Sequence, residues 1–139
     1  MQRIEVDQDF ALPVERVYDY LAEHENLGPI FGAKIARVRD GDDSRNGAGS
    51  VRQLRIGLLP PFEETVTHAV PNELIEYEIT KGSPLRDHHG TMTFSRRGEG
   101  SHLNYVITFG AVVPGLDRIV KVGLERAVRK GLKTVDAKA

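Results

Sequence analysis

The first residues of the chain alternate between apolar and polar side chains. Ile4, Val6 and Phe10 fall on even positions, and acidic residues fill the odd positions between them. A period of two is typical of a strand with one buried face. We therefore expect a strand over residues 2–10.

The period then changes to that of a helix. Val14, Val17, Tyr18 and Leu21 follow the i, i+3, i+4, i+7 spacing of an amphipathic helix, and Pro13 suits its first position. The next segment, NLGPIFG at residues 26–32, has two glycines and a proline. Such residues predict a short second helix or a loop.

Alternation returns between residues 34 and 110, broken by turn sequences rich in glycine, proline and acidic residues. It predicts six more strands, at about 34–39, 49–57, 62–70, 73–81, 86–96 and 102–110. Strands joined by such short links must be antiparallel, because parallel neighbours need a crossover of about a dozen residues or more.

Residues 115–136 contain no proline and predict one helix about 30 Å long. Its basic outer face is expected to be solvated rather than to meet an anionic membrane or an acidic partner. The predicted apolar face comprises Leu116, Ile119, Val120, Gly123, Leu124, Ala127, Val128, Gly131 and Val135.

Two glycines on that face, Gly123 and Gly131, each cost about 1 kcal/mol relative to alanine in a helix interior. Three explanations are open: the glycines leave room for a ligand, they allow close approach to the sheet, or they are tolerated sequence drift without a structural role. A strongly curved sheet touches a long helix mainly along its edges, so this architecture predicts a cavity between sheet and helix.

Composition narrows the class of protein. The 139 residues suit one domain over 1–139, and 40% hydrophobic with 28% charged residues is the balance of a soluble globular protein. The net charge of −1 argues against nucleic-acid binding by bulk charge. The absence of cysteine excludes disulfides and thiolate chemistry. Without an apolar run of membrane length or a signal peptide, we expect a cytoplasmic protein with no stable membrane insertion.

Several segments together carry the pattern of a known family. They include a proline-initiated helix in ALPVERVYDYLAEHENLGPIFG, Gly-x-Gly entering an arginine-bearing strand in GAGSVRQLRI, and glutamate, tyrosine and glycine in successive strands of FEETVTHAVPNELIEYEITKGSPLRDHHGTMTF. The pattern continues in SHLNYVITF and spans essentially the whole chain. It resembles the polyketide cyclase/dehydrase family of the START-like (SRPBCC) superfamily.

The resemblance implies the α+β helix-grip fold. In that fold a curved antiparallel sheet of about seven strands wraps around a long C-terminal helix, with one or two short helices after the first strand. It also implies a hydrophobic ligand pocket between sheet and helix. Members range from aromatase/cyclases to binders of lipids and hormones, so the resemblance indicates a fold more than a reaction.

Strand parity predicts which side chains face the helix. In strand 49–57 we favour Arg52, Leu54 and Ile56, with Val51, Gln53 and Arg55 as the alternative. The predicted inner residues of the other strands are Phe62, Glu64, Val66 and His68; Ile75, Tyr77 and Ile79; His88, Gly90, Met92 and Phe94; and Leu103, Tyr105, Ile107 and Phe109.

Four polar residues thus stand on an otherwise apolar wall, namely Arg52, Glu64, Tyr77 and His88. Buried charges must be paired, so we expect an ion pair between Arg52 and Glu64. That pair is either purely structural or part of a ligand site. The predicted ligand-binding residues are Arg52, Glu64, Tyr77, His88, Met92, Tyr105 and Leu124.

The adjacent histidines do not suit a metal site. His88 and His89 point to opposite faces of a strand, and an ion would need His68, Glu64 or Asp87 to converge on one of them. We predict no metal site and no cofactor. We expect His24, at a helix end, and His102, at a hairpin, to be solvated surface residues.

These observations predict a protein that binds a small, largely hydrophobic molecule such as a polyketide or lipid, as a monomer or homodimer. The alternative is a cyclase/aromatase or dehydratase, in which Arg52 polarises a ketone while Tyr77 or His88 moves protons. A third possibility is a protein-interaction module with a filled core.

Overall fold

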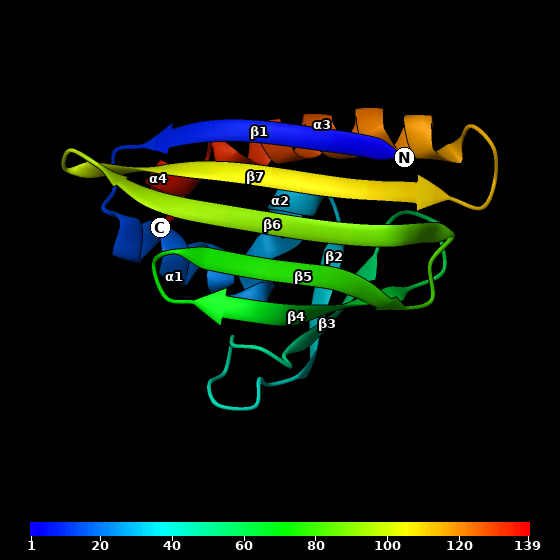
Figure 1. Cartoon of the computed structure of the whole chain (residues 1–139), viewed down its shortest axis with the longest axis horizontal. Helices are drawn as coiled ribbons and strands as arrows, with labels where there is room; N and C mark the ends of the chain where they lie inside the picture. The colour runs from blue at the N-terminus through cyan, green and yellow to red at the C-terminus, as the bar shows by residue number, and fades with distance from the viewer.

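Seven strands pair into one antiparallel sheet in the order β1-β7-β6-β5-β4-β3-β2 (Figure 1). The computed structural model describes residues 1–139. The strands lie within two residues of the predicted bounds at each end, and they are β1 (Gln2–Phe10), β2 (Lys34–Arg39), β3 (Val51–Arg55), β4 (Phe62–Val70), β5 (Leu74–Lys81), β6 (Leu85–Arg97) and β7 (Gly100–Ala111). Strands β2 to β7 pair in chain order, and β1 pairs with β7 along its whole length.

Five short or long helices accompany the sheet: α1 (Val14–Ala22), the 3-10 helix η1 (His24–Leu27), α2 (Gly28–Phe31), α3 (Leu116–Leu132) and α4 (Val135–Lys138). The prediction of a single helix over residues 115–136 is therefore wrong, because the helix is interrupted at Lys133–Thr134. There the Thr134 amide and hydroxyl both donate to the Gly131 carbonyl, at 3.1 and 2.7 Å. This local bonding replaces the regular i to i−4 pattern. No helix has the length and apolar composition needed to span a membrane.

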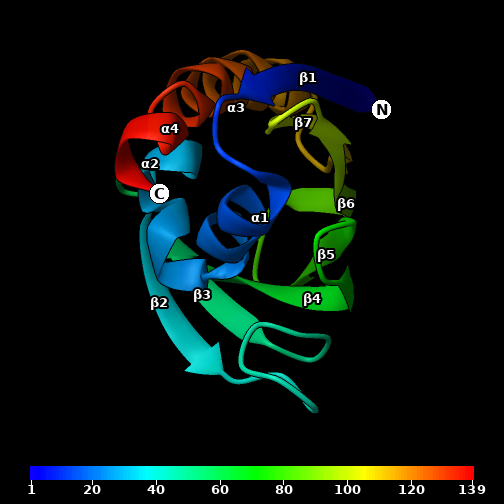
Figure 2. The same ribbon diagram turned by 90° about the vertical axis from the view of Figure 1, so that its left-hand side faces the viewer.

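The sheet curves strongly, as Figure 2 shows, and α1, η1 and α2 lie within the curve. Helix α3 packs against β1 and β7 on one side and α2 on the other. The arrangement is the predicted helix-grip fold.

Packing is uneven along α3. Its last turns bury Val128, Gly131 and Leu132, while Ile119 near its start is 71% exposed. The prediction that Ile119 lies on a buried face is therefore wrong, since the first half of α3 extends beyond the packed core. The core itself lies between the inner face of the sheet and α1, where Val14, Val17, Tyr18 and Leu21 are buried as predicted.

Irregular pairing reverses parity in two strands. The register of β4 against β5 shifts between Val66 and His68, so His68 turns outward with its side chain 70% exposed, and its predicted inward position is wrong. A β-bulge adds one residue to one strand and moves the following side chains to the other face. Another shift lies in β6 against β7, between Arg86 and His89.

Candidate functional site

A cavity of about 320 Å³ lies between the sheet, α2 and the first half of α3. Most of its wall is apolar, and Glu64 is its one charged side chain. It is lined by Phe31, Gly32, Leu54, Ile56, Leu59, Phe62, Glu64, Tyr77, Ile79, Leu85, His88, Val120, Gly123, Leu124 and Ala127. A more open depression of about 590 Å³ lies beside α2 and β2. It is lined by only one hydrophobic residue and does not include Glu64, Tyr77 or His88.

The two glycines of α3 explain why the cavity lies where it does. A Cβ atom added at Gly131 would lie 2.8 Å from the Ile30 Cα and the Pro29 carbonyl oxygen, so Gly131 lets α3 approach α2 rather than the sheet. A Cβ atom added at Gly123 would meet nothing within 4 Å. The helix is therefore tightly packed at one end and faces open space at the other.

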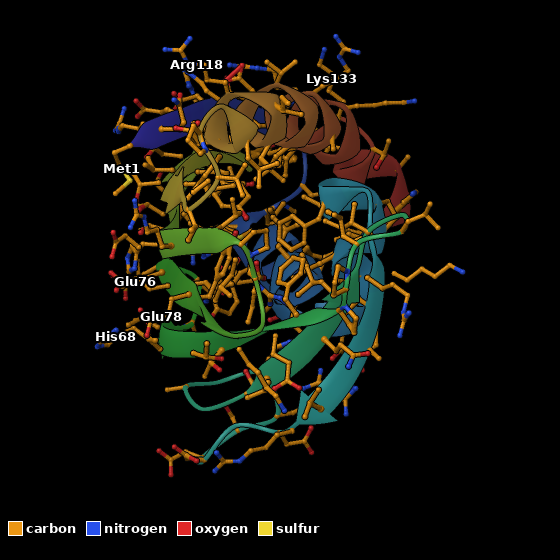
Figure 3. All side chains as sticks on the ribbon, turned by 90° about the vertical axis from the view of Figure 1, so that its right-hand side faces the viewer. Met1, His68, Glu76, Glu78, Arg118 and Lys133 are labelled. Atoms are coloured by element: carbon orange, nitrogen blue, oxygen red, sulfur yellow. The ribbon has the colours of Figure 1, made fainter.

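The ends of β5 and β7 and the starts of β4, β6 and α3 lie at the end of the molecule viewed in Figure 3. Three turns meet there, and the Val112 amide donates to the Pro84 carbonyl at 3.1 Å between two of them. Leu58, Leu59 and Val113 from these turns are exposed. Figure 3 also shows Glu76 and Glu78 on the outside of the sheet, as strand parity predicts.

The predicted ion pair is present. Arg52 and Glu64 face each other across β3 and β4, and the Arg52 Nε donates to Glu64 Oε1 at 2.8 Å. The Arg52 Nη2 is also 2.8 Å from that oxygen but is not aligned for a hydrogen bond. Both side chains are more than nine-tenths buried. The guanidinium lies over the Tyr77 ring, 4.7 Å from its centroid, and is not part of the cavity lining.

His88 owes its position to a distortion of β6. Asp87 has a φ of 52°, and the pairing of β5 with β6 stops at Tyr77 and Gly90. The Ile79 amide, left without a β6 carbonyl, donates to the His88 Nδ1 at 3.1 Å. Because Nδ1 accepts, the proton of the neutral ring lies on Nε2, which is 3.8 Å from Glu64 Oε2.

The charge state of His88 follows from the same surroundings. Burial is the main cause that lowers its pKa, and the Arg52 cation adds to it, while the Glu64 carboxylate opposes both. The lowered pKa keeps the imidazole neutral at pH 7.

Tyr77 forms one wall of the cavity. Its hydroxyl hydrogen-bonds the Tyr105 hydroxyl, and burial raises the pKa of both phenols. The ring lies against the backbone of Gly90, where an added Cβ would come within 2.2 Å of it. Gly90 therefore accommodates the tyrosine ring and leaves no free space for a ligand at that point.

The seven predicted ligand-binding residues separate into two groups. Glu64, Tyr77, His88 and Leu124 line the cavity, whereas Arg52, Met92 and Tyr105 are buried behind its wall. The cavity is also lined by three residues that the sequence pattern does not predict, Phe31, Leu59 and Leu85. They come from a short helix, a turn and the first residue of β6, where periodicity assigns no face.

The other histidines lie outside the cavity. His24 is fully buried, so its predicted surface position is wrong: its Nε2 lies 2.9 Å from the Ser50 hydroxyl, and burial lowers its pKa to about 3. His102 is partly exposed and hydrogen-bonds two aspartates of β1, which raise its pKa. His68 and His89 lie on the outer face, and no three histidine or acidic side chains are grouped to hold a metal ion.

Comparison with known proteins agrees with this architecture. A family model described as "Polyketide cyclase / dehydrase and lipid transport" matches residues 1–139. No curated protein matches the chain significantly.

Solved structures share the fold at low sequence identity. A protein from Thermus thermophilus is 18% identical over 99% of this chain and 100% of its own, with a TM-score of 0.76. The Zhui aromatase/cyclase from a Streptomyces species is 18% identical over 99% and 92%, with a TM-score of 0.72. The Aha1 dimer from Colwellia psychrerythraea is 11% identical over 100% of both chains, with a TM-score of 0.72.

Proposed function

Because the chain belongs to the polyketide cyclase/dehydrase and lipid-transport family, we propose that it binds a small, largely hydrophobic molecule in the cavity between sheet and α3. One observation carries this proposal: the apolar cavity has two polar groups at its inner wall, Glu64 and His88, that do not satisfy each other. Small-molecule sites combine apolar walls with a few such groups.

A purely structural role for the Arg52–Glu64 ion pair would leave part of this arrangement unexplained. Glu64 uses Oε1 for Arg52, and its Oε2 and the His88 Nε2 have no hydrogen-bond partner in the protein. Neither atom is among the fully enclosed polar atoms without a partner, so both are open to the cavity, where a bound group can reach them. A ligand such as a polyketide or lipid with one polar end supplies that partner.

Native mass spectrometry of the protein purified from its own cells tests the proposal, since a bound molecule adds a defined mass. Binding of Nile red, a neutral apolar dye, gives an independent measurement. Leu124→Trp places a bulky ring in the cavity and is expected to reduce dye binding at least tenfold. Ile119→Trp, on the exposed face of the same helix, is the control and should bind as the unaltered protein does. Equal binding by both variants would place the dye elsewhere.

Catalysis by a cyclase or dehydratase is the second candidate, favoured by the nearness of His88 Nε2 and Glu64 Oε2 in the cavity. Arg52 is poorly placed to polarise a ketone, because its guanidinium is enclosed behind Glu64. Tyr77 is a poor acid, because burial raises its pKa and its hydroxyl is bonded to Tyr105. Proton transfer would then fall to His88 and Glu64. His88→Gln should abolish turnover of a polyketide substrate while leaving its binding measurable; unchanged turnover would exclude this role.

A further inference from the structure

The gap between His88 and Glu64 has a defined chemistry. One side presents a hydrogen-bond donor, the His88 Nε2–H, and the other an acceptor, the Glu64 Oε2, with 3.8 Å between the two atoms. That distance is too long for a hydrogen bond between them. Both side chains line the cavity, and both are more than nine-tenths buried.

Each of the two groups is held in place from behind. The Ile79 amide fixes the His88 ring through Nδ1, which settles the position of the ring proton. Arg52 holds the Glu64 carboxylate through Oε1, which leaves Oε2 toward His88. A donor and an acceptor that are fixed in this way form a preorganised site, which lowers the cost of ordering on binding.

Resting on the proposed function, we propose that the ligand is a neutral molecule bearing a hydroxyl group, and that this hydroxyl bridges His88 and Glu64. An oxygen about 2.8 Å from both atoms would lie within normal hydrogen-bonding distance of each. A hydroxyl accepts from His88 and donates to Glu64 through the same oxygen. A ketone or ether oxygen can only accept, so it leaves Glu64 without a donor.

Charge excludes acidic ligands from the same position. Glu64 is the only charged side chain that lines the cavity, and its balancing cation, Arg52, lies behind it. A ligand carboxylate placed at the polar wall would therefore meet a carboxylate first. Any water in the gap makes the same two hydrogen bonds as a hydroxyl, so only a group that reproduces both displaces it without loss of affinity.

A series of ligands with one naphthalene skeleton tests the proposal by isothermal titration calorimetry at pH 7. The probes are 2-naphthol, its methyl ether 2-methoxynaphthalene, and the anion 2-naphthoate. We expect 2-naphthol to bind about tenfold more tightly than the ether, as suits a hydrogen bond to a charged acceptor. The carboxylate should bind most weakly of the three.

Two adjacent histidines provide matched variants. His88→Leu should reduce the preference for the naphthol over the ether to about twofold or less, and His89→Leu, on the outer face of β6, should leave the preference unchanged. The ligand series on the unaltered protein decides the question even if His88→Leu is unstable.

The outcomes separate this proposal from the one on which it rests. Equal affinity for naphthol and ether, or tightest binding of the naphthoate, overturns the hydroxyl bridge but keeps the hydrophobic cavity as a binding site. Absence of binding by all three probes and by Nile red overturns both.

Discussion

The contrast between Gly123 and Gly131 tests how tightly the two ends of α3 are packed. Both residues lie in α3, and replacing either by alanine removes a helix-propensity cost of about 1 kcal/mol. At Gly123 the new methyl group meets nothing within 4 Å. Gly123→Ala should therefore stabilise the protein by about 1 kcal/mol, which raises the Tm by about 3 °C for a domain of this size.

Gly131→Ala should have the opposite effect. Its Cβ would lie 2.8 Å from the Ile30 Cα and the Pro29 carbonyl oxygen, and both are backbone atoms that move only if α2 shifts. Overpacking of this kind costs about 1–3 kcal/mol, which offsets or exceeds the gain in helix propensity. The net change should lie between zero and a destabilisation of about 2 kcal/mol.

Urea unfolding followed by far-UV circular dichroism measures both variants, with linear extrapolation of the free energy of unfolding to water. Gly123→Ala should exceed Gly131→Ala in stability by about 1–3 kcal/mol. If Gly123→Ala were as destabilising as Gly131→Ala, side chains would have to fill the space beside Gly123. The open space beside Gly123, and with it this part of the cavity wall, would then be refuted.

Three further perturbations test the buried polar groups. Arg52→Met should destabilise the protein by about 3–5 kcal/mol, because Glu64 would remain as a buried unpaired charge, and adding Glu64→Leu should recover most of that loss in urea unfolding; a double variant no more stable than the single one would contradict this. The pKa of His24 falls to about 3 on folding from an unfolded value of about 6.5, so the unfolded state binds more protons between these values, and stability should decline by up to about 1.4 kcal/mol per pH unit as the pH falls through this window. His24→Gln should flatten that slope in unfolding midpoints measured from pH 7 to pH 4, and an unchanged slope would assign it to other groups. Gly90→Ala should displace the Tyr77 ring, reduce stability by about 1–3 kcal/mol and weaken the near-UV tyrosine signal, whereas an unchanged spectrum would argue against the close contact.

Regular pairing explains which features could be predicted from the sequence. In β5 the pattern of Ile75, Tyr77 and Ile79 against Glu76 and Glu78 has a period of two without interruption, and the structure keeps it. The inward positions of Arg52, Glu64 and His88 followed from neighbours of the same parity. Parity is reliable there because one slip would move every apolar side chain of the strand to the solvent face.

Three residues show where local periodicity fails to predict the position of a side chain. His68 has the same strand parity as Val66, but the bulge between them turns His68 outward. No residue type in the segment indicates a bulge. His24 is buried because η1 packs its ring against Ser50, a contact between distant parts of the chain. Ile119 repeats the apolar spacing of α3 correctly, yet the helix extends past the core at that point. In each case the outcome depends on tertiary packing rather than on local periodicity.

The same kind of irregularity builds the candidate site. With regular pairing, the Ile79 amide would bond a β6 carbonyl and both nitrogens of His88 would remain free. The distortion at Asp87, whose positive φ costs about 1–3 kcal/mol, instead directs Nδ1 to that amide and leaves the Nε2 proton for the cavity. Strained backbone that persists next to a cavity is commonly functional. Parity could therefore place His88 on the inner face, but only the break in pairing determines which nitrogen carries the proton and that Glu64 Oε2 remains unpaired opposite it. Strand parity predicts where His88 lies, but the hydrogen-bonding chemistry of the site depends on the interruption of regular strand pairing.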